Sequence, residues 1–332
     1  MSGPVRPLVS GWQRFWFEPQ ETSSLALFRI AFGLVATAWT ATQAPTLLAF
    51  YGPHGILPDQ PGGGPGSWGV LAVSNTSGAV VTLFVVTLAA SVALTVGLFS
   101  RIAALVVWVG IVSFEHRNGL VSNSGDGLIR NLAFFCALAP CGAALSIDRL
   151  RAAPDRFWEF PARAPWALRL VQIQLSVGYL SAVWQKAGNA MWRDGTAVSY
   201  ALRIDDLRRA PTPAFVTHSV LLTELLTFGT LAVELSLGVL VWNRALRPWV
   251  LMLGLILHLS IEVSILVGFF SLAMLAAYLA FVPPETAARR ALAARDLLGR
   301  LRRRRAGGAR EEAPRRPHPG PSAVAGEAAD AG

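Results

Sequence analysis

The stretch APWALRLVQIQLSVGYLSAVWQKAGNAMWRDG, residues 164–195, decides how this chain is organised. Its apolar part predicts a helix over residues 166–185. The run ends at Lys186, which is the only lysine in 332 residues, because every other Lys or Arg position holds arginine. A single amine between Trp184 and Trp192, at the end of an apolar helix, is therefore a candidate site at a membrane boundary.

The composition around this stretch is typical of a membrane protein. The chain is 53% apolar, only 15% charged and holds eleven tryptophans, whereas soluble domains carry about 25% charged residues. We expect a multi-pass protein of the cell (plasma) membrane, in contact with the lipid bilayer. The expected parts are an interfacial N-terminal segment (1–22), a transmembrane domain (23–284) and a basic, largely disordered C-terminal tail (285–332).

Eight apolar runs predict an all-α fold, a bundle of about eight transmembrane helices. Arginines concentrate in alternate loops, which predicts that the N- and C-termini are cytoplasmic. The exception is the charged outer loop of residues 186–219, and an exception to this electrostatic bias indicates a functional role for the loop. The runs cover residues 23–49, 78–99, 102–116, 127–145, 166–185, 220–242, 249–267 and 269–282.

The net charge of +9 lies largely in the tail, where residues 289–316 hold eleven of the twenty-nine basic residues. Neither a nucleic-acid-binding motif nor interleaved aromatic residues accompany it, so we expect no nucleic-acid partner. A basic segment beside a membrane helix instead favours contact with the anionic inner leaflet.

Ionisable residues inside the runs need partners or a wet cavity, because a charge at the bilayer centre costs about 2.5–3.5 kcal/mol. Arg29 lies two turns into the first run. Asp126 and Arg130 are four residues apart and are expected to pair along one helix face. His258 and Glu262 have the same spacing, and we expect a buried histidine bonded to a carboxylate beside a polar cavity. Arg29 and the Asp126–Arg130 pair also fit purely structural roles.

No metal centre is expected from these residues. His258 and Glu262 supply two ligands of the three or four that a metal usually needs. The two cysteines, Cys136 and Cys141, are five residues apart on one predicted helix and point away from each other, so a disulfide between them is not expected.

Lys186 has two interpretations. In the first, its side chain snorkels from the helix end to water, within an ordinary aromatic belt. Arginine would serve that purpose equally well, and the chain uses arginine everywhere else. In the second, the amine acts as a base, because burial beside Trp184 and Trp192 disfavours its charged form.

Four segments in order resemble the membrane region of the vitamin K-dependent gamma-carboxylases, and resemble still more closely their bacterial relatives, the HTTM (horizontally transferred transmembrane) proteins. The similarity covers about residues 12–284. The segments are LALFRIAFG (25–33), HRNGLVSNSGDGLIRNLAFFCALAPCGAALSIDR (116–149), VWQKAGNAMWRDG (183–195) and HLSIEVSILVGFFSLAMLA (258–276).

This resemblance implies a site. In the animal carboxylases a lysine deprotonates reduced vitamin K, oxygen adds, and the strong base that forms removes a proton from a glutamate side chain before carbon dioxide adds. By position, Lys186 looks like that lysine and His258 looks like the histidine of the quinone-binding cavity. Arg29, Asp126, Arg130, Trp184, Trp192 and Glu262 are then expected to shape and charge the cavity.

The sequence departs from the carboxylases in three places, so other functions stay open. It ends shortly after the last apolar run, it has Ser124-Gly125-Asp126 where the family has Asn-His, and it has Gln185-Lys186 in place of a lysine pair. One alternative is a non-enzymatic accessory factor for the maturation or export of a secreted peptide. Another is a quinone-linked oxidoreductase partner, because the Arg29 motif also resembles DoxX-like membrane proteins.

Overall fold

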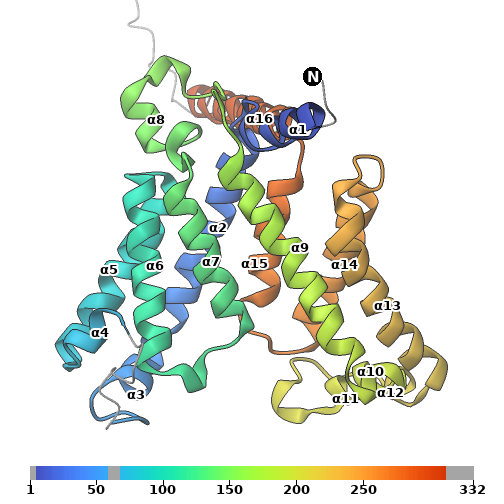
Figure 1. Cartoon of the computed structure of the whole chain (residues 1–332). Helices are drawn as coiled ribbons and strands as arrows, with labels where there is room; N and C mark the ends of the chain where they lie inside the picture. The colour runs from blue at the N-terminus through green and yellow to red at the C-terminus, as the bar shows by residue number, and fades with distance from the viewer. Residues whose placement is uncertain (1–4, 59–67, 312–332) are drawn as a thin grey trace, which may run out of the picture. The chain divides into compact units, whose positions relative to one another are not determined.

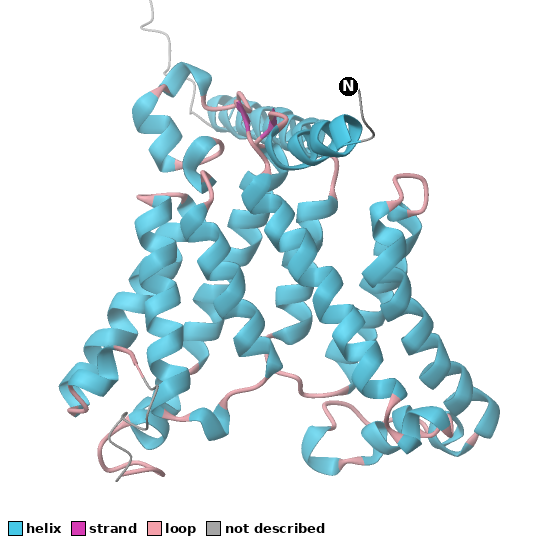
Figure 2. Ribbon diagram, viewed as in Figure 1, coloured by secondary structure: helices cyan, strands magenta, loops and turns pink. Residues whose placement is uncertain are grey.

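Helices make up nearly all of the secondary structure in the computed structural model, which describes residues 5–58 and 68–311 (Figures 1 and 2). The described residues up to 288 form one compact unit, and the described residues from 289 onward belong to a second. The strands among the described residues are β1 (Gln20–Glu21) and β2 (Ala162–Arg163), which pair antiparallel. The predicted all-α fold is confirmed.

Each of the eight apolar runs contains a helix, fifteen to twenty-two residues long in seven runs and nine residues long in the last, and shorter helices lie between them. The helices in the apolar runs are α2 (Ser23–Thr42), α5 (Ser77–Val96), α6 (Ser100–Arg117), α7 (Ser124–Leu138), α9 (Trp166–Ala187), α13 (Val220–Val239), α14 (Arg247–Ser264) and α15 (Phe270–Tyr278). The shorter ones are α3 (Leu47–Tyr51), α4 (Val70–Val73), α8 (Ile147–Ala152), α10 (Ala190–Arg193), α11 (Ala197–Arg203) and α12 (Ala214–His218). The terminal helices are α1 (Val5–Phe17) and α16 (Pro284–Glu311).

Four helical segments are long and apolar enough to cross a membrane by length and composition: Ser23–Tyr51, Ser77–Val96, Val220–Trp242 and Arg247–Ser264. The other four helices of the apolar runs are shorter or more polar; α15, for example, has nine residues, and α9 carries Arg169 and Lys186. This set marks the chain as a membrane protein.

The short helix α15 lies between two groups of helices (Figure 1). It packs against α2 and α7 of one group and against α9 and α14 of the other. Small side chains make this close approach possible, because Ser271, Ala273 and Ala277 are buried at the contacts. The N-terminal group is joined by α2 against α5, α5 against α6 and α6 against α7, and the C-terminal group by α9 against α13 and α13 against α14.

The outer faces of α13 and α14 are apolar and exposed, as faces in contact with lipid must be. Only five of the twenty residues of α13 and three of the eighteen of α14 are buried. The exposed side chains are large and apolar, and they include Leu221, Leu225, Leu235, Val239, Trp249, Ile256, Leu259 and Val263.

Arg29 is fully buried between Gly97, at the turn that joins α5 to α6, and the segment that precedes α8. Its Nη2 donates to the carbonyl oxygen of Leu145 at 2.6 Å. In the same turn, the carboxylate of Asp148 accepts hydrogen bonds from the backbone N–H groups of Phe99 and Ser100 at 2.7 and 2.9 Å, and so caps α6. Gly97 ends α5 with a φ of 73°, a conformation that favours glycine.

We predict that Gly97→Ala destabilises the protein by at least about 1–2 kcal/mol, because alanine is strained at this φ. The new Cβ would also lie 1.9 Å from Nη1 of Arg29 and 2.4 Å from Cβ of Ser146. A lower thermal unfolding midpoint in detergent would measure the effect. Gly178→Ala is the matched control, because nothing lies within 4 Å of its added Cβ; equal midpoints for the two variants would contradict the packing described here.

Candidate functional site

A cavity of about 520 Å³ lies at the C-terminal end of α9, and its size suits a small organic ligand. Residues from α11, α13, α14 and the turn at 210–213 form its wall, which is largely apolar. Lys186 and Glu234 are the charged residues of the lining. The other lining residues include Trp192, Ala197, Leu202, Pro211, Pro213, Leu226, Thr230, Leu257, Ser260, Ile261 and Ile265.

Lys186 and Glu234 form an ion pair at this cavity. The ammonium Nζ of Lys186 donates to Oε1 of Glu234 on α13, and it lies 4.7 Å from the ring centroid of Trp192. The side chain of Lys186 is 25% exposed and that of Glu234 is 9% exposed. The second carboxylate oxygen of Glu234 is buried and has no hydrogen-bond partner among the described residues. The site therefore holds one proton donor and one free acceptor side by side.

The two tryptophans that flank Lys186 in sequence occupy different environments. Trp192 lines the cavity and stacks its ring near the ammonium group. Trp184 is 82% exposed and is not among the residues that line the cavity, so the structure does not bring it together with Lys186 as expected. Because Trp184 is two residues before Lys186, its side chain leaves the helix on another face.

His258 is buried behind the cavity rather than in its lining. Its Nε2 is 2.7 Å from the hydroxyl of Tyr179 on α9, and that hydroxyl is 2.5 Å from the hydroxyl of Tyr278 on α15. The predicted bond between His258 and Glu262 is wrong, since Glu262 accepts instead from Nη2 of Arg209 at 2.8 Å.

Arg209 reaches Glu262 because its chain segment is fixed to the end of α14. The backbone N–H of Arg209 donates to the carbonyl of Ser264 at 3.0 Å, and the N–H of Leu266 donates to the carbonyl of Leu207 at 2.6 Å. Glu262 therefore tethers the loop of residues 186–219, which forms much of the cavity wall, and does not line the cavity itself.

Asp126 and Arg130 do not pair with each other, contrary to the prediction. Asp126 accepts from the indole N–H of Trp39 at 2.7 Å and from the backbone N–H of Asn123 at 2.8 Å, which completes a capping box at the start of α7. Arg130 instead pairs with Glu115 on α6 at 2.6 Å. Neither residue, nor Arg29, lines the Lys186 cavity.

Three residues of this region were not predicted as site residues from the sequence: Glu234, Tyr179 and Tyr278. Glu234 was visible as a carboxylate within an apolar run, but nothing in the sequence connects it to Lys186. Tyr179 is seven residues before Lys186 and so lies on the same face of α9. The chain has only four tyrosines, and two of them, Tyr179 and Tyr278, lie in apolar runs of the sequence. Their hydroxyl groups need hydrogen-bond partners there, and this need could have indicated a polar contact between helices.

Within residues 5–58 and 68–311 no three His, Cys, Asp or Glu side chains are grouped so as to hold a metal ion. Cys136 and Cys141 are free thiols, and the Sγ of Cys141 is 3.3 Å from the carbonyl oxygen of Cys136. Cys141 lies in a separate turn, Cys141–Ala143, rather than on the helix of Cys136 as predicted.

The apolar helices, the exposed apolar faces and the paired charges between helices define an α-helical integral membrane protein. A family model described as the HTTM domain matches residues 68–285, and the chain belongs to this family. Membership supports the relation to the membrane region of the gamma-carboxylases. No curated protein and no solved structure matches the chain.

We predict that Asp126→Ala lowers the stability of the protein by about 2 kcal/mol, because it leaves the buried indole N–H of Trp39 unpaired and removes the helix cap. Thermal unfolding in detergent measures this change. Asp155→Ala, an exposed carboxylate outside any ion pair among the described residues, is the control. A stable Asp126→Ala protein would contradict the structural role assigned to this side chain.

Proposed function

We propose that the chain is an HTTM-type protein of the plasma membrane that crosses the bilayer eight times, with both termini in the cytoplasm and the Lys186 cavity toward the outer side. The presence of a helix in each of the eight apolar runs supports the number of spans. The concentration of arginine in alternate loops supports the orientation.

In this proposal the cavity binds a reduced quinone, such as reduced vitamin K, and Lys186 acts as the base. The observation that carries it is the ion pair of Lys186 and Glu234 in the lining of a largely apolar cavity of about 520 Å³. Apolar walls suit a quinone ring and its hydrocarbon chain. Lys186 and Glu234 then meet one of the two hydroxyls of the reduced quinone.

The ion pair supplies the means of proton transfer. One proton moving from Nζ to Glu234 turns the charged pair into a neutral amine and a carboxylic acid, and a weakly hydrated site favours the neutral pair relative to water. The amine of Lys186 can then take the proton of a hydroxyl placed beside it. Glu234 holds the exchanged proton, and its second oxygen is free to orient the ligand.

His258 has a positioning role in this scheme. It does not line the cavity, so it does not touch the ligand in this arrangement. Through the hydroxyl of Tyr179 it fixes the face of α9 that carries Lys186 two turns further on. The pair of Tyr179 and Tyr278 joins the same face to α15.

We predict that the purified protein binds reduced vitamin K and catalyses its oxidation by oxygen from the air. Lys186→Arg should slow this oxidation by about 10²–10⁴-fold. Arginine keeps the positive charge but does not give up its proton. Near-ultraviolet absorbance and mass spectrometry of the extracted quinone measure the conversion. Glu234→Gln should slow it as well, because the exchange partner of the proton is lost.

Gln185→Ala is the matched control, since its exposed side chain neighbours Lys186 but does not line the cavity. Equal conversion by wild type and Lys186→Arg would remove the base role. Binding of the quinone that is unchanged in all variants, with no conversion, would favour a quinone-linked partner protein, and the absence of any retained quinone would favour an accessory role in peptide maturation or export.

A further inference from the structure

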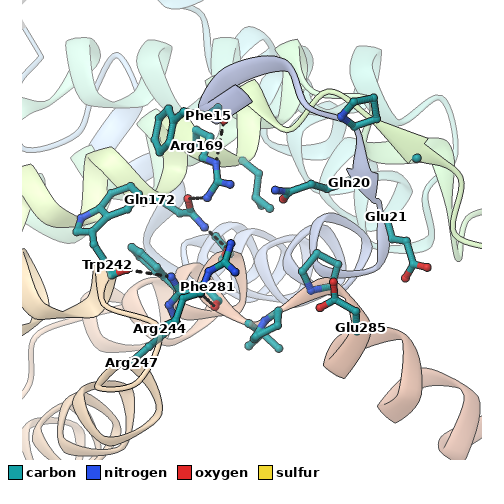
Figure 3. A pocket seen from close by; sticks show the side chains of 17 residues that line it. Phe15, Gln20, Glu21, Arg169, Gln172, Trp242, Arg244, Arg247, Phe281 and Glu285 are labelled. Carbon is teal, nitrogen blue, oxygen red and sulfur yellow. Dashed lines mark hydrogen bonds between the residues drawn. The ribbon is translucent and has the colours of Figure 1, made fainter. Parts of the chain in front are cut away.

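A second cavity, of about 580 Å³, lies near the N-terminal end of α9 (Figure 3). Arg169 lines it, and Arg169 is seventeen residues before Lys186, so the two sites are about 26 Å apart along the helix. Its wall comes from α1, β1, the first turns of α9 and α14, and the start of α16. This cavity has no part in the function proposed above.

Two arginines in this cavity are held by neutral groups. The Nε of Arg169 donates to the carbonyl of Phe15 at 3.2 Å, and its Nη1 donates to Oε1 of Gln172 at 2.9 Å. The Nε of Arg247 donates to the carbonyl of Val241 at 2.9 Å. These bonds orient the guanidinium groups, but they do not neutralise their charge.

A third arginine, Arg244, also lines the cavity and is close enough for its charge to act on both Arg169 and Arg247. Within the described residues none of the three forms an ion pair with a carboxylate. The two glutamates of the lining, Glu21 and Glu285, lie away from the arginines (Figure 3). The like charges therefore gather on one side without a counter-ion.

Guanidinium groups bind phosphate strongly, because their N–H groups match its oxygens in pairs. The exposed aromatic residues of α1, beside the cavity, favour a lipid headgroup over a free ion as the source of the phosphate. This helix contributes Phe15 to the cavity wall and exposes Trp12 and Phe17. Exposed aromatic side chains on a short terminal helix are typical of the headgroup region of a bilayer.

We propose that this cavity binds a phosphate group through Arg169, Arg244 and Arg247, and that the phosphate is the headgroup of an anionic phospholipid. The arginines hold the phosphate, while Phe15, Trp242 and Phe281 supply aromatic lining that suits the apolar part of the lipid. The partly apolar lining accounts for a lipid better than for a free ion.

We predict that phosphatidylglycerol added to the full-length protein in mild detergent binds and raises its thermal unfolding midpoint. Native mass spectrometry should count the retained lipid. Arg244→Gln should weaken the binding about tenfold, the effect of losing one charge-assisted hydrogen bond. Arg244 has an exposed side chain, so its loss leaves the fold intact. Arg169→Gln should weaken binding as well, although it also removes contacts to Phe15 and Gln172.

Three further measurements test whether the lipid binds through its phosphate at this cavity. Arg151→Gln removes an exposed arginine of α8 that does not line the cavity, and it should bind the lipid as wild type does. Inorganic phosphate that stabilises wild type but not Arg244→Gln would support the phosphate site and assign it to a soluble anion. Equal stabilisation by diacylglycerol, which lacks phosphate, or equal loss in Arg151→Gln, would overturn the proposal.

Discussion

The ion pair of Lys186 and Glu234 joins α9 to α13, and the constraint behind it governs the rest of the bundle. Charged groups between membrane helices are stable only with partners, because lipid supplies none. The same rule explains Arg130 with Glu115 and the Trp39 indole with Asp126. Polar contacts of this kind determine which helices pack together. Apolar helix faces carry no such pairing information and lie against lipid.

One face of α9 gathers these contacts along its whole length. Arg169, Gln172, Ser176, Tyr179 and Lys186 follow one another at spacings of three, four, three and seven residues, which keeps them on one face of a helix. Each binds a different element: Gln172 donates to the carbonyl of Ala280, Trp242 donates to Ser176, and Tyr179 meets His258. Since a cavity lies near each end of this face, α9 links the two sites of the molecule.

The all-α fold and the position of Lys186 at the end of an apolar helix could be predicted from the sequence, because they depend on local runs of apolar residues. Pairing could not be predicted. The spacing of Asp126 and Arg130, or of His258 and Glu262, permits a bond along one helix, but Trp39, Glu115, Tyr179 and Arg209 reach these groups from other helices and loops. Glu234 is 48 residues from Lys186, and only the packing of α13 on α9 brings them together.

The environment of Lys186 at the end of α9 differs from that of a lysine in an aromatic belt. A snorkelling lysine extends its ammonium group away from the bundle into water. Lys186 instead turns toward the bundle, where its ammonium group donates a hydrogen bond to the carboxylate of Glu234 and lies over the ring of Trp192. Trp184, two residues earlier, takes the outward position and is 82% exposed. Because Lys186 and Trp184 leave the helix on different faces, the amine lies in the cavity lining, paired with Glu234, while the indole of Trp184 is exposed.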